Sequence, residues 1–101
     1  MQNVLESHLP ELIALFKKNN VVKAYTFGSV LSDHFTAESD IDFLISFNDK
    51  LTPVEKGENW FSLYYSLKEL LKKDIDLIRE EDIKNPYLLN TINASKLLIH
   101  G

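Results

Sequence analysis

The sequence contains no cysteine and a single arginine, Arg79. Without cysteine there can be no disulfide, no thiolate nucleophile and no zinc site with cysteine ligands. Eleven basic residues against fifteen acidic residues give a formal net charge of −4, so we do not expect direct binding to long nucleic acids. No apolar run approaches the roughly 20 residues of a membrane-spanning helix, and the N-terminus lacks a signal-peptide pattern. We therefore expect a cytoplasmic protein that makes no contact with a membrane.

What is present is an ordinary globular composition, with 45% hydrophobic and 26% charged residues over 101 positions. This length fits one small domain, residues 1–101. Hydrophobic periodicity predicts helices from about 8 to 20, from 53 to 72 and from 85 to 98 or 99, with Ser7 capping the first. Strands are predicted at 21–27, 40–47 and 74–78, and a short helix or turn at 29–35. The order predicts an α/β (α+β) fold in which helices pack against a small mixed sheet.

Gly28 and Ser29 stand where the first predicted strand ends. A glycine lets the backbone turn sharply and lets a ligand approach closely. Free backbone N–H groups at the start of the next segment, together with the Ser29 hydroxyl, suit an anion such as a phosphate. Taken alone, the pair is better explained as a plain turn.

Asp40 and Asp42 follow after a gap of ten residues. Side chains two apart in a strand share a face, so both carboxylates would lie on one side while Ile41, Phe43 and Ile45 face the core. Aspartate is unfavourable in strands, and two neighbouring carboxylates repel each other. A divalent cation bound between them is the simplest compensation. The alternative is that Asp40 belongs to a loop and only Asp42 lies in the strand.

The third predicted strand begins with the same pattern, Asp74-Ile75-Asp76. If it lies beside the strand at 40–47, a third carboxylate joins the first two. Asp76 is the favoured candidate because its sequence neighbours are more apolar. Asp74 follows two lysines and is expected to be solvated, but it stays open as the alternative.

Together these residues resemble the minimal nucleotidyltransferases of the polymerase-β-like superfamily. Their pattern is Gly-Ser at the end of a strand, Asp-x-Asp nine to thirteen residues later, and a third aspartate on a later strand. The matching segments here are Phe27-Gly28-Ser29, Ser39-Asp40-Ile41-Asp42 and Ile75-Asp76-Leu77-Ile78. The segment from Asn85-Pro86-Tyr87 onward resembles the closing helix of these short proteins. The resemblance covers nearly the whole chain and implies the polymerase-β-like nucleotidyltransferase fold.

The resemblance also implies the roles of the site residues. Asp40, Asp42 and Asp76 would be the catalytic residues and would bind two Mg²⁺ ions that carry the nucleoside triphosphate, ATP. Asp76 would also help to take the proton of the acceptor. The residues that would contact the nucleotide are Gly28, Ser29 and Ser39.

One departure from the family pattern concerns positive charge near the phosphates. Many relatives carry an arginine soon after the Gly-Ser pair. Residues 30–34 contain no lysine or arginine. A protonated His34, or Arg79, is left as the candidate cation.

A partner is implied as well. Short proteins of this group are often paired with a small helical toxin of the HEPN type, a ribonuclease that the antitoxin inactivates by adding AMP to a tyrosine. The size agrees, because a chain of about 100 residues has room for one nucleotide site and little else. Two alternatives are an antitoxin that neutralises its partner by binding alone and a transferase acting on a small hydroxyl-bearing molecule. A homodimer and a hetero-oligomer both stay open.

Four aromatic residues of the long helix, Trp60, Phe61, Tyr64 and Tyr65, are predicted to face the core. Phe61 and Tyr65 fall beside the main apolar stripe and widen it. They are therefore also candidates for a protein interface.

Overall fold

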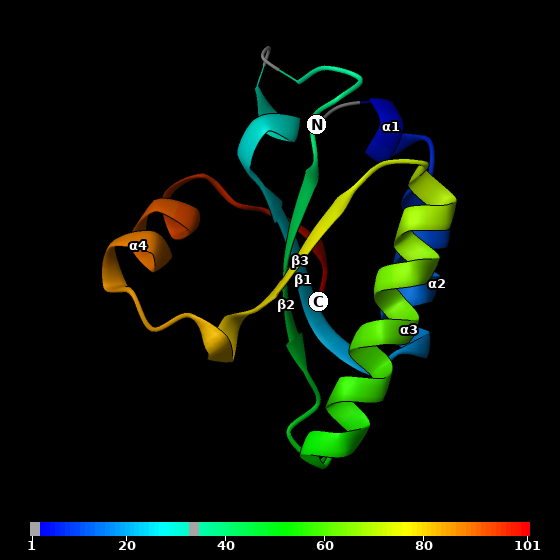
Figure 1. The fold of residues 1–101 in the computed structure, drawn as a ribbon, viewed down its shortest axis with the longest axis vertical. Helices are drawn as coiled ribbons and strands as arrows, with labels where there is room; N and C mark the ends of the chain where they lie inside the picture. Colours follow the sequence, from blue (N-terminus) through cyan, green and yellow to red (C-terminus); the bar gives the residue numbers. More distant parts are fainter. Residues whose placement is uncertain (1–2, 33–34) are drawn as a thin grey trace.

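A four-stranded sheet with helices on both faces organises the chain (Figure 1). The computed structural model describes residues 3–32 and 35–101. The helices are α1 Asn3–Glu6, α2 Leu9–Lys18, α3 Pro53–Leu71 and α4 Pro86–Ser95, with short 3-10 helices η1 Gly28–Leu31 and η2 Glu80–Asp82. The strands are β1 Val21–Phe27, β2 Ile41–Phe47, β3 Ile75–Arg79 and β4 Leu97–His100. The predicted mixed α/β fold is confirmed.

The sheet has the strand order β3-β2-β1-β4. β1 runs antiparallel to β2 and β4, whereas β2 and β3 are parallel. Helices α2 and α3 lie on one face and α4 lies on the other (Figure 1). Ile41, Phe43 and Ile45 of β2 belong to the main core together with Phe16 of α2. Leu44 points to the opposite face and is also fully buried, so β2 is buried on both faces, as its apolar sequence predicts.

The first long helix begins differently from the prediction. His8, and not Ser7, occupies the N-cap of α2, and it makes no capping hydrogen bond with its side chain. The Ser7 hydroxyl instead donates to the Val4 carbonyl oxygen at 3.4 Å, because the short helix α1 directly precedes it. Pro10 lies in the first turn of α2, where proline is tolerated.

The long helix α3 starts at a capping box formed by Thr52 and Glu55. Its aromatic residues are divided between two environments. Trp60 and Tyr64 pack against the core, as predicted. Phe61 and Tyr65 are 57% and 63% exposed, so their predicted core position is wrong, because each residue turns the helix by about 100° and takes these two off the buried stripe.

The C-terminal segment also differs from the prediction. A helix to residue 98 or 99 is wrong, since α4 ends at Ser95 and Lys96 is extended. Leu97–His100 form β4, which pairs with β1 between Ala24 and Thr26. The open edge of β1 supplies backbone partners that local sequence periodicity cannot reveal. In the part of the chain that the structure describes, no helix is long and apolar enough to cross a membrane.

Candidate active site

Asp42 and Asp76 lie side by side at the start of two parallel strands. They are register partners across β2 and β3, and alternation places them on the sheet face opposite the main core. Asp40 precedes β2, which begins at Ile41. The prediction of a strand from residue 40 is therefore wrong by one residue, and Asp40 belongs to the preceding loop. Its charge still acts on Asp42, so the three carboxylates share one end of the sheet.

The ionised form of the Asp42 carboxyl group is electrostatically unfavourable in this environment. Its pKa is raised to about 6, first by burial, then by the charges of Asp76 and Asp40, and finally by a hydrogen bond with Asp76. No lysine, arginine or histidine among the described residues forms an ion pair with it. Burial and like charges both disfavour the ionised carboxylate. A cation at this position would relieve that cost.

Gly28 closes the site from the end of β1. Its φ of +80° lies in the left-handed region, which glycine adopts without steric cost. A Cβ atom at this position would collide with the Oδ2 atom of Asp42. The glycine is therefore required both by its backbone conformation and by the close approach of the carboxylate.

Thr26 fixes the backbone at the same place. Its fully buried hydroxyl donates a hydrogen bond to the Asp42 carbonyl oxygen at 2.9 Å. The sequence motifs do not include this residue. The available signal was a hydroxyl residue two positions before the glycine, in a strand rich in β-branched and aromatic residues.

The two predicted serine contacts lie in turns on either side of the carboxylates. Ser29 is in η1, and its carbonyl oxygen accepts hydrogen bonds from the backbone and hydroxyl of Ser32, both at 3.0 Å. The Ser39 hydroxyl accepts from the Thr36 backbone N–H at 3.0 Å and so closes the turn that leads to Asp40. His34 lies outside the described residues.

Asp74 is set apart from the other three aspartates. Its side chain is 80% exposed and lies 3.8 Å from the Lys68 ammonium group, in agreement with the predicted solvated position. Its carbonyl oxygen accepts a hydrogen bond from the Ile41 N–H at 3.0 Å. Asp74 therefore contributes its backbone to the pairing of β2 with β3, while Asp76 faces Asp42.

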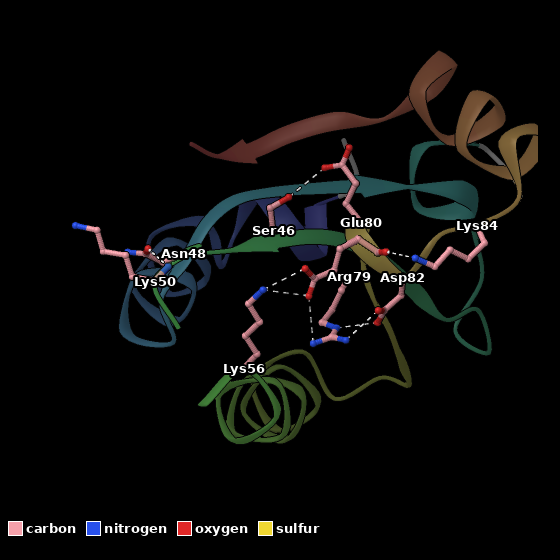
Figure 2. A network of polar contacts seen from close by, with 9 residues as sticks. Ser46, Asn48, Lys50, Lys56, Arg79, Glu80, Asp82 and Lys84 are labelled. Atoms are coloured by element: carbon pink, nitrogen blue, oxygen red, sulfur yellow. Dashed lines mark hydrogen bonds and ion pairs between the residues drawn. The ribbon is translucent and has the colours of Figure 1, made fainter. Parts of the chain in front are cut away.

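Arg79, the last residue of β3, forms an ionic network at the end of the strand that lies away from Asp76 (Figure 2). Its guanidinium group donates to both carboxylate oxygens of Asp82, at 2.7 and 2.9 Å, and lies 3.4 Å from Glu81. Glu81 also pairs with Lys56 at 3.1 Å. Asp76 is the second residue of β3 and Arg79 is its last. This geometry does not support Arg79 as the cation that binds the phosphates.

The donor set of the site suits a hard divalent cation. Within residues 3–32 and 35–101, no three acidic or histidine side chains already form a metal-binding cluster. The exposed Asp76 side chain already forms a hydrogen bond with Asp42, however, and the exposed Asp40 is near enough for its charge to act on Asp42. Carboxylate oxygens are the ligands that Mg²⁺ prefers. Burial, followed by the charges of Asp76 and Asp40, raises the pKa of Asp42, and a bound cation would offset this cost of ionisation. The three carboxylates therefore fit a magnesium site.

Comparisons with known proteins agree with this arrangement. A family model described as "Polymerase beta, Nucleotidyltransferase" matches residues 10–101. Among curated proteins, "Putative protein adenylyltransferase MJ0126" of Methanocaldococcus jannaschii is 29% identical over 99 residues, which cover 98% of this chain and 94% of that protein. A second protein of this organism, named "Putative protein adenylyltransferase MJ1379", is 29% identical over 103 residues with the same coverage of both chains.

Solved structures share the fold. A toxin–antitoxin structure with AMP-PNP superposes with a TM-score of 0.72 at 22% identity, covering 92% of this chain and 73% of that one. The tri-AMPylated HEPN toxin of Shewanella oneidensis in complex with its MNT antitoxin gives a TM-score of 0.67 at 20% identity, covering 95% and 71% of the two chains. At these identities the likeness establishes a common fold.

Proposed function

Because the chain belongs to the polymerase-β nucleotidyltransferase family, whose model spans residues 10–101, we propose that it transfers AMP from ATP to a tyrosine hydroxyl of a partner HEPN-type toxin and so acts as an antitoxin. The observation that carries this proposal is the pairing of Asp42 with Asp76, with Asp40 close by. The names of the protein adenylyltransferase relatives support AMP and a protein acceptor. The toxin–antitoxin complexes among the fold neighbours support the kind of partner.

The reaction requires an in-line displacement at the α-phosphorus of ATP. The acceptor oxygen forms the new bond, the bond from the α-phosphorus to the bridging oxygen breaks, and pyrophosphate leaves. Asp76 is exposed beside Asp42, where it can accept the proton of the acceptor hydroxyl. Two Mg²⁺ ions bound by Asp40, Asp42 and Asp76 would supply charge neutralisation at the phosphates and the acceptor oxygen.

The segments around the carboxylates would orient the nucleotide. Gly28 leaves room at the Asp42 carboxylate, and Ser29 follows directly in η1. Ser39 closes the turn before Asp40. We assign phosphate contacts to Gly28, Ser29 and Ser39, because a turn with no side chain at its apex lets a phosphate approach the backbone closely.

The test is a transfer assay with the protein encoded by the adjacent gene. The chain, its neighbour and Mg²⁺ are incubated with ATP labelled at the α-phosphate or, in parallel, at the γ-phosphate. We expect label in the neighbour only from the α-labelled nucleotide, and loss of label with Asp42→Ala. Absence of label in the neighbour and in any small acceptor, with no effect of Asp42→Ala, would refute the proposal.

A second candidate is an antitoxin that works by binding alone. It is favoured by the lack of lysine and arginine in residues 30–34, and the exposed Phe61 and Tyr65 would offer it a contact surface. An Asp40→Ala/Asp42→Ala double variant that still neutralises the partner would establish it. Label transfer to a small hydroxyl-bearing molecule without any protein partner would instead point to a small-molecule transferase.

A further inference from the structure

The active-site segment carries no lysine or arginine of its own. From residue 24 to residue 49, which includes Gly28, Asp40 and Asp42, neither residue type occurs. A triphosphate is a polyanion, and proteins commonly bind its phosphates with lysine or arginine in addition to metal ions. Any such side chain must therefore come from another part of the fold, and it must lie on the same face of the sheet as the Asp42 carboxylate.

Lys96 lies level with the carboxylates across the sheet. The row of register partners at this level, from β1 to β3, consists of Phe27, Asp42 and Asp76. Lys96 directly precedes β4, whose first residue is the register partner of Thr26. Continuing this antiparallel register by one residue brings Lys96 beside Phe27. Neighbouring strands are about 4.8 Å apart, so the Cα atoms of Lys96 and Asp42 are roughly 10 Å apart.

The Lys96 side chain also lies on the correct face. Its ammonium nitrogen is 4.0 Å from the centre of the Tyr25 ring. Tyr25 is the register partner of Leu44, and directly paired residues share a face of the sheet. Leu44 is two residues from Asp42 and so points the same way. The Lys96 ammonium is therefore on the carboxylate face, on the side of the sheet where Figure 1 shows α4.

The position of Lys96 is fixed while its charge stays available. Its backbone ends α4 by donating a hydrogen bond to the Ile92 carbonyl oxygen at 2.9 Å. In residues 3–32 and 35–101 its ammonium group forms no ion pair. The contact with the Tyr25 ring attracts the cation without cancelling its charge. The half-buried Lys96 ammonium can therefore bind an anion, whereas Arg79 is already paired with Asp82.

We propose that Lys96 binds the phosphates of the nucleotide at the carboxylate site and supplies the positive charge that residues 30–34 lack. This inference rests on the proposed nucleotidyl transfer and adds one binding residue to it. A phosphate bound beside Asp42 lies within reach of a long side chain that starts roughly 10 Å away. Lys96 stays protonated and balances phosphate charge, while Asp76 remains the group that accepts the proton of the acceptor hydroxyl.

Calorimetry of ATP binding with Mg²⁺, without the partner protein, tests the inference. Losing one charge-assisted contact in Lys96→Gln should weaken binding by at least about tenfold, and Lys96→Arg, which keeps the charge, should stay within about threefold. Lys23→Gln is the matched control. Lys23 is the register partner of Ser46 on the same face, but it lies four residues from Phe27, or roughly 13 Å along β1. This variant should stay within about twofold of the wild type, as expected for a screened surface charge.

Inorganic triphosphate with Mg²⁺ is a second probe, because it has neither base nor sugar. As a competitor of ATP, it should lose affinity for Lys96→Gln by the same factor as ATP does. In the transfer assay, the KM for ATP should rise in Lys96→Gln by a larger factor than kcat falls. Circular dichroism spectra that match the wild type in all three variants would show that the losses do not come from unfolding.

Four outcomes would overturn the inference. They are wild-type protein that does not bind ATP, Lys96→Gln that binds ATP as the wild type does, equal losses in Lys96→Gln and Lys23→Gln, and weakened ATP binding with unchanged competition by triphosphate. The last would place Lys96 at the base or sugar. The proposed function fails separately: transfer to the partner can be absent while ATP binding still depends on Lys96, or present with no such dependence.

Discussion

The α-carbon of Gly28 lies against the carboxylate of Asp42, so closely that a Cβ atom would overlap Oδ2. One residue of the Gly-Ser pair thus contacts one residue of the Asp-x-Asp pair, although they are far apart in sequence. A side chain at residue 28 would therefore displace the Asp42 carboxylate.

Gly28→Ala should severely reduce activity. The new methyl group would displace the Asp42 carboxylate, and the φ of +80° would strain any L side chain, at a cost of about 1 kcal/mol or more. AMP transfer and thermal unfolding are the measurements. Gly57→Ala is the matched control, because it adds a methyl group in the open on helix α3 and should stabilise the protein by about 0.5–1 kcal/mol. Full activity in Gly28→Ala would contradict the close contact.

Asp42→Asn should abolish transfer and yet stabilise the protein without metal. In the folded protein the pKa of Asp42 is raised from 3.8 to about 6. A raised carboxyl pKa lowers the free energy of unfolding as pH increases from about 4 to 6, and the loss stays constant above that. The asparagine side chain does not ionise, so the variant avoids this loss. We expect its free energy of unfolding at pH 7.5 to exceed that of the wild type by about 1 kcal/mol, a value reduced for solvent screening because Asp42 is only half-buried.

Thermal unfolding at pH 4 and pH 7.5, with and without Mg²⁺, checks this expectation. The advantage of Asp42→Asn should be larger at pH 7.5, and Mg²⁺ should raise the Tm of the wild type more than that of the variant. An advantage that is independent of pH would show that the charge of Asp42 is not its origin.

Thr26→Val should lower both stability and turnover. The substitution keeps the shape of the side chain but removes the hydrogen bond to the Asp42 carbonyl oxygen, at a cost of about 1 kcal/mol. Thr26→Ser retains the hydroxyl and serves as the control for transfer activity. Denaturant unfolding and the kcat of AMP transfer are the readouts; equal kcat values in the valine variant and the wild type would remove Thr26 from the positioning of Asp42.

Arg79→Gln should leave the KM for ATP within about twofold of the wild type, because the arginine is paired with Asp82 at the far end of β3 and exposed pairs contribute little. The free energy of unfolding should fall by no more than about 1 kcal/mol. Steady-state kinetics with varied ATP provides the measurement. A large rise in KM would restore Arg79 as the phosphate-binding cation.

Local sequence patterns predicted the helices and strands that depend mainly on residues nearby in the sequence. The strand at 21–27 follows from its β-branched and aromatic residues, and the long helix follows from its apolar stripe to within one residue. The C-terminal strand could not be predicted in this way, because Leu97–His100 become a strand only through pairing with β1. The exposure of Phe61 and Tyr65 depends likewise on which side of α3 meets the sheet.

The sequence by itself indicated a carboxylate site, since Gly28-Ser29, Asp40 and Asp42 stand out by residue type and spacing, but it left Asp74 and Asp76 as alternatives for the third carboxylate. Tertiary structure decided which groups meet. The parallel pairing of β2 with β3 places Asp76 opposite Asp42 and leaves Asp74 aside. Arg79 is the last residue of β3 and pairs there with Asp82, away from the carboxylates. The reason is physical: strand register and helix packing are long-range, and each sets distances that the order of residues along the chain does not contain.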